Sequence, residues 1–308
     1  MDLALMIEGQ AGLNWPRWQQ MAQAAEDLGF AGLYRSDHFT NANPPDQDSL
    51  EMWISLAWLA SHTKRIQFGP LVSPVSFRHP VLTARMAAAV DDLSGGRLQL
   101  GLGAGWQTRE HANYGFDLLD VPSRMARFEE GVEVITRLLG SDTPVSYSGM
   151  FYRLNEAILL PRPQRPGGPP IIIGGGRLVL PLVARYAQEW NVTFKTPERF
   201  AALNAKLDEV LAKQGRPATE VRRSIMTRPI YARDAAALQT RVATFNKPVE
   251  DLKAAGYLVG TGPELVDQLG RLAEAGVQRV MLQWLDLDDL DAVAAFAGDV
   301  LPHFPSAG

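Results

Sequence analysis

The sequence contains no cysteine among its 308 residues. Disulfide bonds, thiol nucleophiles and zinc–thiolate sites are therefore excluded. Long apolar runs are missing too, because no stretch approaches the roughly 18 consecutive apolar residues that indicate a membrane helix. Residues 1–10 are too short and too polar to be a signal peptide. We therefore expect a soluble cytoplasmic protein without a membrane partner.

Positive charge is in slight deficit, with 30 Lys and Arg against 34 Asp and Glu and a net charge of −4. Nucleic-acid-binding domains favour basic surfaces, so nucleic acid is not expected as a partner. Two further signatures are missing. The histidines show no H-x-H or H-E-x-x-H spacing, and no G-x-S-x-G motif occurs, so we expect neither a metal site nor a serine hydrolase.

The sequence does contain short apolar runs that alternate with helical patterns along its whole length. The runs that we interpret as strands are 3–7, 31–34, 66–72, 97–102, 171–173, 190–194, 224–231 and 277–284. Alternation of this kind predicts a parallel sheet with helices packed on it. Eight such units favour a closed (β/α)8 TIM barrel over an open doubly wound sheet.

Two segments interrupt the alternation. The first is a predicted insertion at about 144–170, which follows the fourth predicted helix at 124–139. It begins with a hairpin at 144–154. Residues 232–262 form a second, less readable insertion, which is either helical or a mobile lid. No linker composition divides the chain, so residues 1–308 are expected to form one domain.

Ser36-Asp37-His38 follows the second predicted strand. The carboxyl ends of barrel strands carry active sites, which favours a functional reading. His38 there can donate or accept a proton near neutral pH, and Asp37 can orient it or bind a ligand N–H group. The alternative is that Asp37 caps a helix and that His38 is incidental.

The third and fourth predicted strands end in unusual residues. Pro70 and Pro74 flank a segment that predicts a bulge, which would press Leu71 and Val72 against a planar ring, unless proline merely ends the strand there. Gly103-Ala104-Gly105 exposes backbone to a ligand, and Arg109 beyond it can pair with a phosphate or carboxylate. The alternative is a tight loop with Arg109 on a solvated helix face.

Gly174-Gly175-Gly176 follows the fifth predicted strand and opens a helix. Free N–H groups at such a position favour an anion, most naturally a phosphate. The motif is neither a Walker A loop nor a G-x-G-x-x-G fingerprint.

Taken together, these motifs resemble those of the luciferase-like flavin and deazaflavin oxidoreductases, the bacterial-luciferase superfamily, and within it the coenzyme F420-dependent branch. The resemblance covers essentially the whole chain and is strongest over residues 31–191. The segments that carry it are Ser36-Asp37-His38-Phe39, Leu59-Ala60-Ser61-His62-Thr63, Arg65-Ile66-Gln67-Phe68-Gly69, Phe77-Arg78-His79-Pro80, Asp92-Leu93-Ser94-Gly95-Gly96-Arg97, Gly101-Leu102-Gly103-Ala104-Gly105-Trp106, Arg109-Glu110-His111 and Ile173-Gly174-Gly175-Gly176.

The resemblance implies a site for F420 in which Asp37 lies beside the ring system and His38 close to its reacting face. It also implies a non-prolyl cis peptide at Leu71-Val72 or its neighbour, in a bulge that backs the ring. The further cofactor contacts that it implies are Ser73, Gly103, Ala104, Gly105 and Arg109, with Gly174, Gly175 and Gly176 at the phosphate-bearing tail. Relatives are commonly dimers, so a homodimer is expected.

These implications predict an oxidoreductase that transfers a hydride between F420 and a small organic substrate near His38, Trp106 and Glu51. Trp106 stands where sugar-phosphate dehydrogenases of this branch carry a catalytic glutamate, which disfavours that activity. The helix after Gly176 begins with Arg177-Leu178-Val179-Leu180, where relatives often show a threonine, so tail anchoring is expected to differ. Two alternatives stay open: an FMN-dependent monooxygenase of the same superfamily, and a non-catalytic cofactor-binding barrel.

Overall fold

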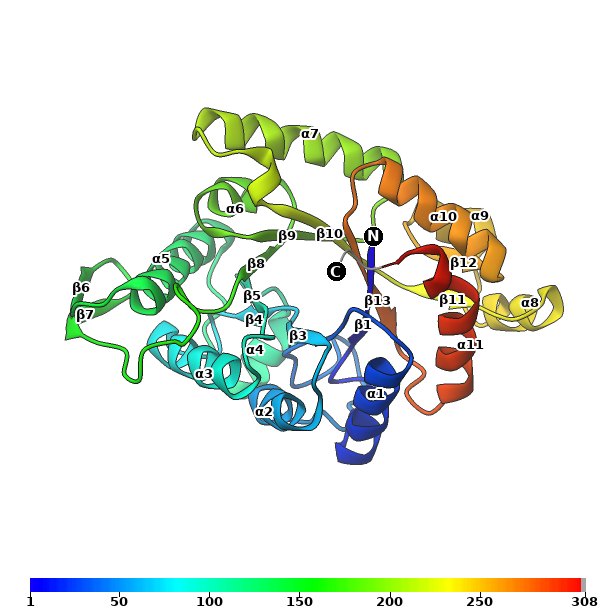
Figure 1. Cartoon of the computed structure of the whole chain (residues 1–308), viewed down its shortest axis with the longest axis horizontal. Coiled ribbons are helices and arrows are strands. Elements are labelled where there is room, and N and C mark those ends of the chain that lie inside the picture. The colour runs from blue at the N-terminus through cyan, green and yellow to red at the C-terminus, as the bar shows by residue number, and fades with distance from the viewer. Residues whose placement is uncertain (306–308) are drawn as a thin grey trace.

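The chain forms a barrel of parallel strands surrounded by helices, as the computed structural model of residues 1–305 shows (Figure 1). The strand order is β3-β2-β1-β13-β10-β9-β8-β5-β4. The bounds are β1 Asp2–Ile7, β2 Gly32–Arg35, β3 Gln67–Pro70, β4 Ser73–Pro74, β5 Leu100–Gly103, β8 Ile171–Gly174, β9 Glu189–Thr193, β10 Arg222–Thr227 and β13 Arg279–Trp284.

The barrel closes through an interrupted strand. β3 pairs with β2 on one side, while β4 pairs with β5 on the other, and only Leu71 and Val72 separate them. A parallel bridge from Phe68 to Leu98 joins the two sides directly. Counted as one strand, β3 and β4 complete the eight-stranded (β/α)8 barrel that the sequence predicts, and this prediction is confirmed.

Helices follow the barrel strands in chain order. Their bounds are α1 Trp15–Asp27, α2 Met52–His62, α3 Pro80–Leu93, α4 Thr108–Tyr114, α5 Val121–Gly140, α6 Leu180–Tyr186, α7 Pro197–Lys213, α8 Ala235–Ala243, α9 Val249–Ala254, α10 Gly262–Glu274 and α11 Leu290–Val300. Three 3₁₀ turns lie at η1 Arg177–Val179, η2 Ala218–Glu220 and η3 Leu301–His303. The side chains of Asn14, Asp120 and Thr196 accept backbone N–H bonds where α1, α5 and α7 begin, and a proline follows each cap.

Alternate residues of each strand divide the core in two. The outward side chains, among them Leu5, Leu33 and Leu282, pack in the main apolar layer under the helices. The inward ones, such as Met6 and Met281, fill the barrel itself. This alternation leaves one face of every strand end free to build a site at the carboxyl edge.

The amino-terminal end of the barrel is closed by buried polar side chains. Arg279 Nη1 donates to Glu189 Oε2 at 3.0 Å and to the Tyr34 hydroxyl at 2.6 Å, and Arg279 Nη2 donates to Gln67. All of these groups except Gln67, which is partly buried, are almost wholly removed from solvent. This end is therefore a plug and not an opening.

Two small sheets lie outside the barrel, on opposite sides of the molecule in Figure 1. An antiparallel pair, β6 Val145–Ser148 and β7 Arg153–Ala157, follows α5. A parallel pair joins β11 Pro229–Tyr231 to β12 Leu258–Gly260. The predicted strand 224–231 is thus divided: Pro229 has no N–H to extend the ladder, and the chain leaves the barrel after Thr227.

No helix within residues 1–305 is both long and apolar enough to cross a bilayer.

Candidate active site

A cavity of about 590 Å³ opens at the carboxyl ends of the barrel strands. Its size lies within the range of about 300–1,000 Å³ that is common for small-molecule sites. The predicted residues that line it are His38, Leu71, Val72, Gly103, Ala104, Gly105, Trp106, Gly174, Gly175 and Gly176. The structure thus brings together the ends of the second, third, fourth and fifth barrel strands, as the sequence analysis expects.

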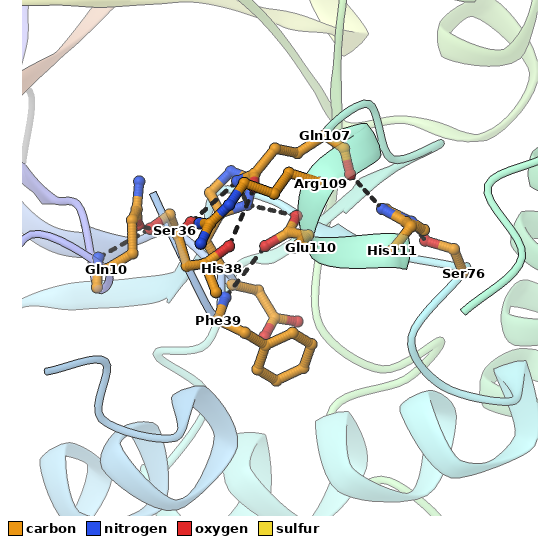
Figure 2. Close-up of polar contacts among 12 residues, drawn as sticks. Gln10, Ser36, His38, Phe39, Ser76, Gln107, Arg109, Glu110 and His111 are labelled. Carbon is orange, nitrogen blue, oxygen red and sulfur yellow. Dashed lines mark hydrogen bonds and ion pairs between the residues drawn. The ribbon is translucent and has the colours of Figure 1, made fainter. Parts of the chain in front are cut away.

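His38 is held from behind by a buried carboxylate on α4. Glu110 Oε1 lies 2.8 Å from His38 Nδ1, and Glu110 Oε2 accepts the backbone N–H of Phe39 at 3.1 Å (Figure 2). Both oxygens therefore fix the segment after β2. With Nδ1 engaged, Nε2 is the ring nitrogen left for a ligand in the cavity that His38 lines.

The Glu110 contact also influences the protonation of His38. Burial alone lowers the pKa of an imidazole, since the cation loses its solvation. The hydrogen bond and the negative charge of Glu110 act in the opposite direction and prevail, so the pKa of His38 is raised above its ordinary value. His38 is therefore biased toward the protonated form, which is able to donate a proton from Nε2.

Aromatic side chains pack around this pair. Trp106 meets the His38 ring edge-to-face at 5.6 Å between ring centroids, and its own side chain is 62% exposed at the cavity mouth. Phe39 stacks among Phe77, Tyr114 and Phe116. The cluster holds the loop after β2 against α4, which keeps His38 and Glu110 in register.

One wall of the cavity, called the bare wall here, consists of Leu71, Val72, Gly103, Ala104 and Gly174–Gly176. A Cβ atom at Gly103 would lie 2.4 Å from Val72 Cγ2, and one at Gly174 would lie 3.0 Å from Val72 Cγ1. A side chain at Gly103 would therefore force Val72 to move, and one at Gly174 would press against it. The two glycines thus leave a flat apolar surface against which a planar ring can lie.

The peptide bond between Leu71 and Val72 is cis, although neither residue is proline. It lies between β3 and β4, and both residues line the cavity. The cis peptide implied by the family resemblance is confirmed.

The facing wall, called the polar wall here, consists of Glu8, Gln10, Ser36, His38 and Gln283. Glu8 Oε2 accepts from Gln10 Nε2 at 3.0 Å, and Glu8 Oε1 accepts from Gln283 Nε2 at 2.7 Å. Ser36 Oγ donates to Gln10 Oε1 at 2.9 Å (Figure 2). These side chains come from the ends of β1, β2 and β13, which are neighbours in the sheet.

Asp37 and Ser73 lie behind the cavity lining and not in it. Ser73 Oγ donates to Asp37 Oδ2 at 3.0 Å, and Arg78 Nη2 donates to Asp37 Oδ1 at 3.2 Å. Asp37 is thereby satisfied by this chain's own donors. Its neighbour in sequence is His38, and that of Ser73 is Val72, so the contact ties the two walls together.

The structure does not bring Glu51 to the cavity. Its carboxylate accepts the N–H of Ile54 at the start of α2 and pairs with Arg78 at 2.9 Å. The helix cap and the ion pair hold this side chain outside the lining.

Arg109 also lies outside the lining, on the outer side of α4. Its guanidinium binds both oxygens of Asp46, at 2.7 and 2.6 Å, and the carbonyl of Asn41 at 2.9 Å. These contacts pin the loop after β2, including residues 41–46, to α4.

Arg124 and Met125 from α5 also line the cavity, as do Leu178, Gly175 and Gly176. Gly175 has φ +144°, which a side chain rarely tolerates, and Gly176 precedes η1. The lining therefore includes a cation and bare backbone, the two kinds of group that bind an anion.

The sequence analysis missed Glu8, Gln10, Arg124 and Gln283 as lining residues. The signal for Glu8 is available, since it follows β1 directly at the functional edge. Gln283 is on the last strand, two residues after inward-facing Met281. Arg124 lies on a long helix with a polar outer face, and nothing in the sequence separates it from a solvated charge.

Among the residues that the structure describes, no group of three or more His, Asp and Glu side chains is arranged to hold a metal ion.

Comparison with known proteins gives one family and several relatives. A family model described as luciferase-like monooxygenase matches residues 5–300. The chain is 35% identical over 172 residues to an F420-dependent glucose-6-phosphate dehydrogenase of Amycolatopsis mediterranei, covering 54% of the chain and 49% of the relative. It is 32% identical over 191 residues to 4-hydroxyprotoasukamycin monooxygenase of Streptomyces nodosus subsp. asukaensis, covering 61% and 49%. Each of these two matches spans about half of the relative.

Among solved structures, an F420-dependent secondary alcohol dehydrogenase in complex with an F420-acetone adduct superposes with a TM-score of 0.86. The match covers 99% of both chains at 19% sequence identity, so it establishes the shared barrel fold.

Proposed function

The chain belongs to the luciferase-like monooxygenase family, and from this we propose that it is an F420-dependent oxidoreductase that moves a hydride between the cofactor and a small organic substrate. The relatives named above include both an F420-dependent dehydrogenase and a monooxygenase. One observation carries the proposal: the cavity combines a bare wall with a histidine that a buried carboxylate orients and biases toward its protonated form.

The cavity fits a flat tricyclic cofactor. Gly103 and Gly174 leave the surface beside Val72 free of side chains, and a Cβ at either position would crowd it. Leu71 and Val72 would support one face of the ring, while Gly175, Gly176 and Arg124 would hold the anionic tail. When bound, F420 supplies hydride chemistry at its deazaflavin carbon, which no side chain can supply.

This chain's residues contribute position and a proton. His38 Nε2 would hold a proton beside the substrate, and Glu110 orients the imidazole through Nδ1 and favours its charged form. A substrate between the two walls would receive that proton in the reductive direction, or give one up in the oxidative direction. Trp106 at the mouth limits water access and favours a planar or apolar substrate body.

The other predicted cofactor contacts enter the proposal as positioning residues. Asp37 and Ser73 join the segments that carry His38 and Val72. A direct cofactor contact by Arg109 requires its ion pair with Asp46 to open. The sugar phosphate named for one relative is not carried over, because Trp106 replaces the glutamate which that activity is expected to need.

Titration of purified apoprotein with F420 and, separately, with FMN tests the proposal. We expect tight F420 binding, followed by substrate-dependent change of its absorbance across an alcohol and carbonyl panel. Preferential FMN binding with substrate-dependent oxygen uptake would instead establish the monooxygenase. Tight binding without turnover on any acceptor would favour a non-catalytic barrel.

We also propose a homodimer that uses the outer surface of α2 and α3. Ile54 is 60% and Leu82 55% exposed on these two adjacent helices. Light scattering coupled to size exclusion measures the assembly, and paired Ile54→Lys and Leu82→Lys substitutions should give a monomer with an intact barrel.

A further inference from the structure

The polar wall has an acceptor that the proposed hydride and proton transfers do not use. Glu8 directly follows the first strand, is partly buried and lines the cavity. An ionised carboxylate offers about four lone-pair sites and no donor. The amide groups of Gln10 and Gln283 occupy one site on each oxygen. Acceptor capacity therefore remains on the cavity side.

The two glutamines hold Glu8 without neutralising it, because amides are uncharged. The charge of Glu8 acts on His38 and Arg35, but the nearby cations make their hydrogen bonds and ion pairs to other groups. Glu110 pairs with His38, and Arg78 pairs with Asp37 and Glu51. Arg35, behind the wall, donates to the carbonyls of Ser36 and Leu50 and to Ser55 Oγ.

Arg124, on α5, also lines the cavity but does not belong to the polar wall. An anion is favoured beside Arg124 and disfavoured beside Glu8. Glu8 therefore favours a ligand group that can donate a hydrogen bond to it.

We propose that Glu8 determines substrate class by accepting a hydrogen bond from a hydroxyl, N–H or ammonium group and by repelling carboxylates and phosphates. This inference rests on the proposed function, which places the cofactor against the bare wall and leaves the polar wall to the substrate. Gln10 and Gln283 are positioning residues that aim the carboxylate. Neutral alcohols and amines are the substrate class that fits, and phosphorylated sugars do not.

Calorimetric binding of three ligands with the same hydrocarbon body tests the assignment. Cyclohexylmethylamine, cyclohexylmethanol and cyclohexanecarboxylate are titrated into the F420-loaded protein and, in parallel, into the apoprotein. Wild-type protein should bind the ammonium ligand most tightly and the carboxylate least. Glu8→Gln should weaken the ammonium ligand and strengthen the carboxylate, each by about tenfold, because a hydrogen bond to a charged group is lost and a repulsion removed.

Two variants control the result. Asp267→Asn on the exposed face of α10 makes the same change of net charge far from the cavity and should leave all three affinities unchanged. Glu8→Met keeps the length of the side chain but removes both acceptors, and it should abolish the preference between the ligands. Thermal unfolding of each variant is measured alongside.

The outcomes separate the two proposals. An unchanged ligand order in well-folded Glu8→Gln and Glu8→Met would overturn the role of Glu8. A uniform loss of affinity for all three ligands with a lower melting temperature would assign Glu8 a bracing role only, which also overturns it. If F420 fails to bind but the apoprotein shows the expected order and its reversal, the proposed cofactor is wrong while the selectivity of Glu8 stands.

Discussion

The two ends of the barrel both contain charged side chains inside the sheet, yet they differ in what those charges contact. At the amino-terminal end, Arg279 and Glu189 bind each other and their neighbours Tyr34 and Gln67. At the carboxyl end, His38 and Glu8 keep atoms directed at a cavity. Glu189 Oε1 and Arg279 Nε at the plugged end also lack hydrogen-bond partners in the part of the chain that the structure describes, so neither an internal charge nor its unused capacity is by itself a sign of function. The difference is that His38 and Glu8 line a cavity that a ligand can enter.

The largest effect is expected at the plugged end. Arg279→Met leaves the buried carboxylate of Glu189 without its cation, which should lower the free energy of unfolding by about 3–5 kcal/mol. Urea unfolding measures it. The double variant Arg279→Met, Glu189→Met should recover most of the loss, and failure to recover would mean that packing and not charge dominates there.

His38→Asn should instead reduce turnover strongly while changing stability little. The amide can keep a hydrogen bond to Glu110, so stability should change by less than about 1 kcal/mol. Turnover should fall by roughly 10²–10⁴-fold, because the proton donor is lost. Absorbance of F420 during turnover measures the rate, and F420 titration should show unchanged affinity. Wild-type turnover in this variant would remove His38 from the mechanism.

Glu110→Gln sharpens the comparison by removing a charge and keeping the shape. The pKa of His38 should fall, because only the charges of Glu8 and Asp37 then still oppose the effect of burial. In the wild type, the raised pKa of His38 stabilises the folded state. This stabilisation is fully present below the pKa of His38 in the unfolded chain, about 6.5, and is lost as pH rises through its pKa in the folded protein.

The variant should therefore be destabilised most at low pH, and its reductive activity should decline at a lower pH than that of the wild type. Proton NMR of the His38 ring measures the pKa, and unfolding at two pH values measures the linkage. An unshifted His38 titration would contradict the role given to Glu110.

The smallest effects concern the bare wall. Gly103→Ala places a methyl group against Val72 and should cost about 1–3 kcal/mol of stability. It should also weaken cofactor binding, because the wall is no longer flat. Gly270→Ala in α10, where a Cβ meets no neighbouring atom within 4 Å, should be stabilising by up to about 1 kcal/mol. Equal cofactor affinity in both variants would argue against a ring on this wall.

The fold was predictable because each barrel strand is an apolar run with its own boundary signal. For example, the capping residue Asn14 and the nearby Pro16 mark the start of α1 directly in the sequence. The exception is strand 224–231, in which apolar character continues past Thr227 although the hydrogen-bond ladder does not. Composition cannot reveal which partner a strand will find once it leaves the sheet.

The site was predictable where backbone geometry decides it, as at Gly103 and Gly174. It was less predictable where long polar side chains decide it. Glu51 and Arg109 stand at suitable positions but reach partners of their own, Arg78 and Asp46. A flexible charged side chain can pair with any of several oppositely charged residues. The distances that decide between them are set only when the chain folds.

The seam where β3 approaches β5 sets a boundary for engineering. A Cβ atom at Gly69 would fall 1.8 Å from the Gln99 carbonyl oxygen, and one at Gly101 would fall 2.0 Å from that of Pro70. A backbone carbonyl group, unlike the end of a side chain, cannot relieve such a clash by changing rotamer. A mutant library built on this scaffold should therefore keep both glycines. It should vary exposed residues that line the cavity, such as Trp106, Val121 and Leu178.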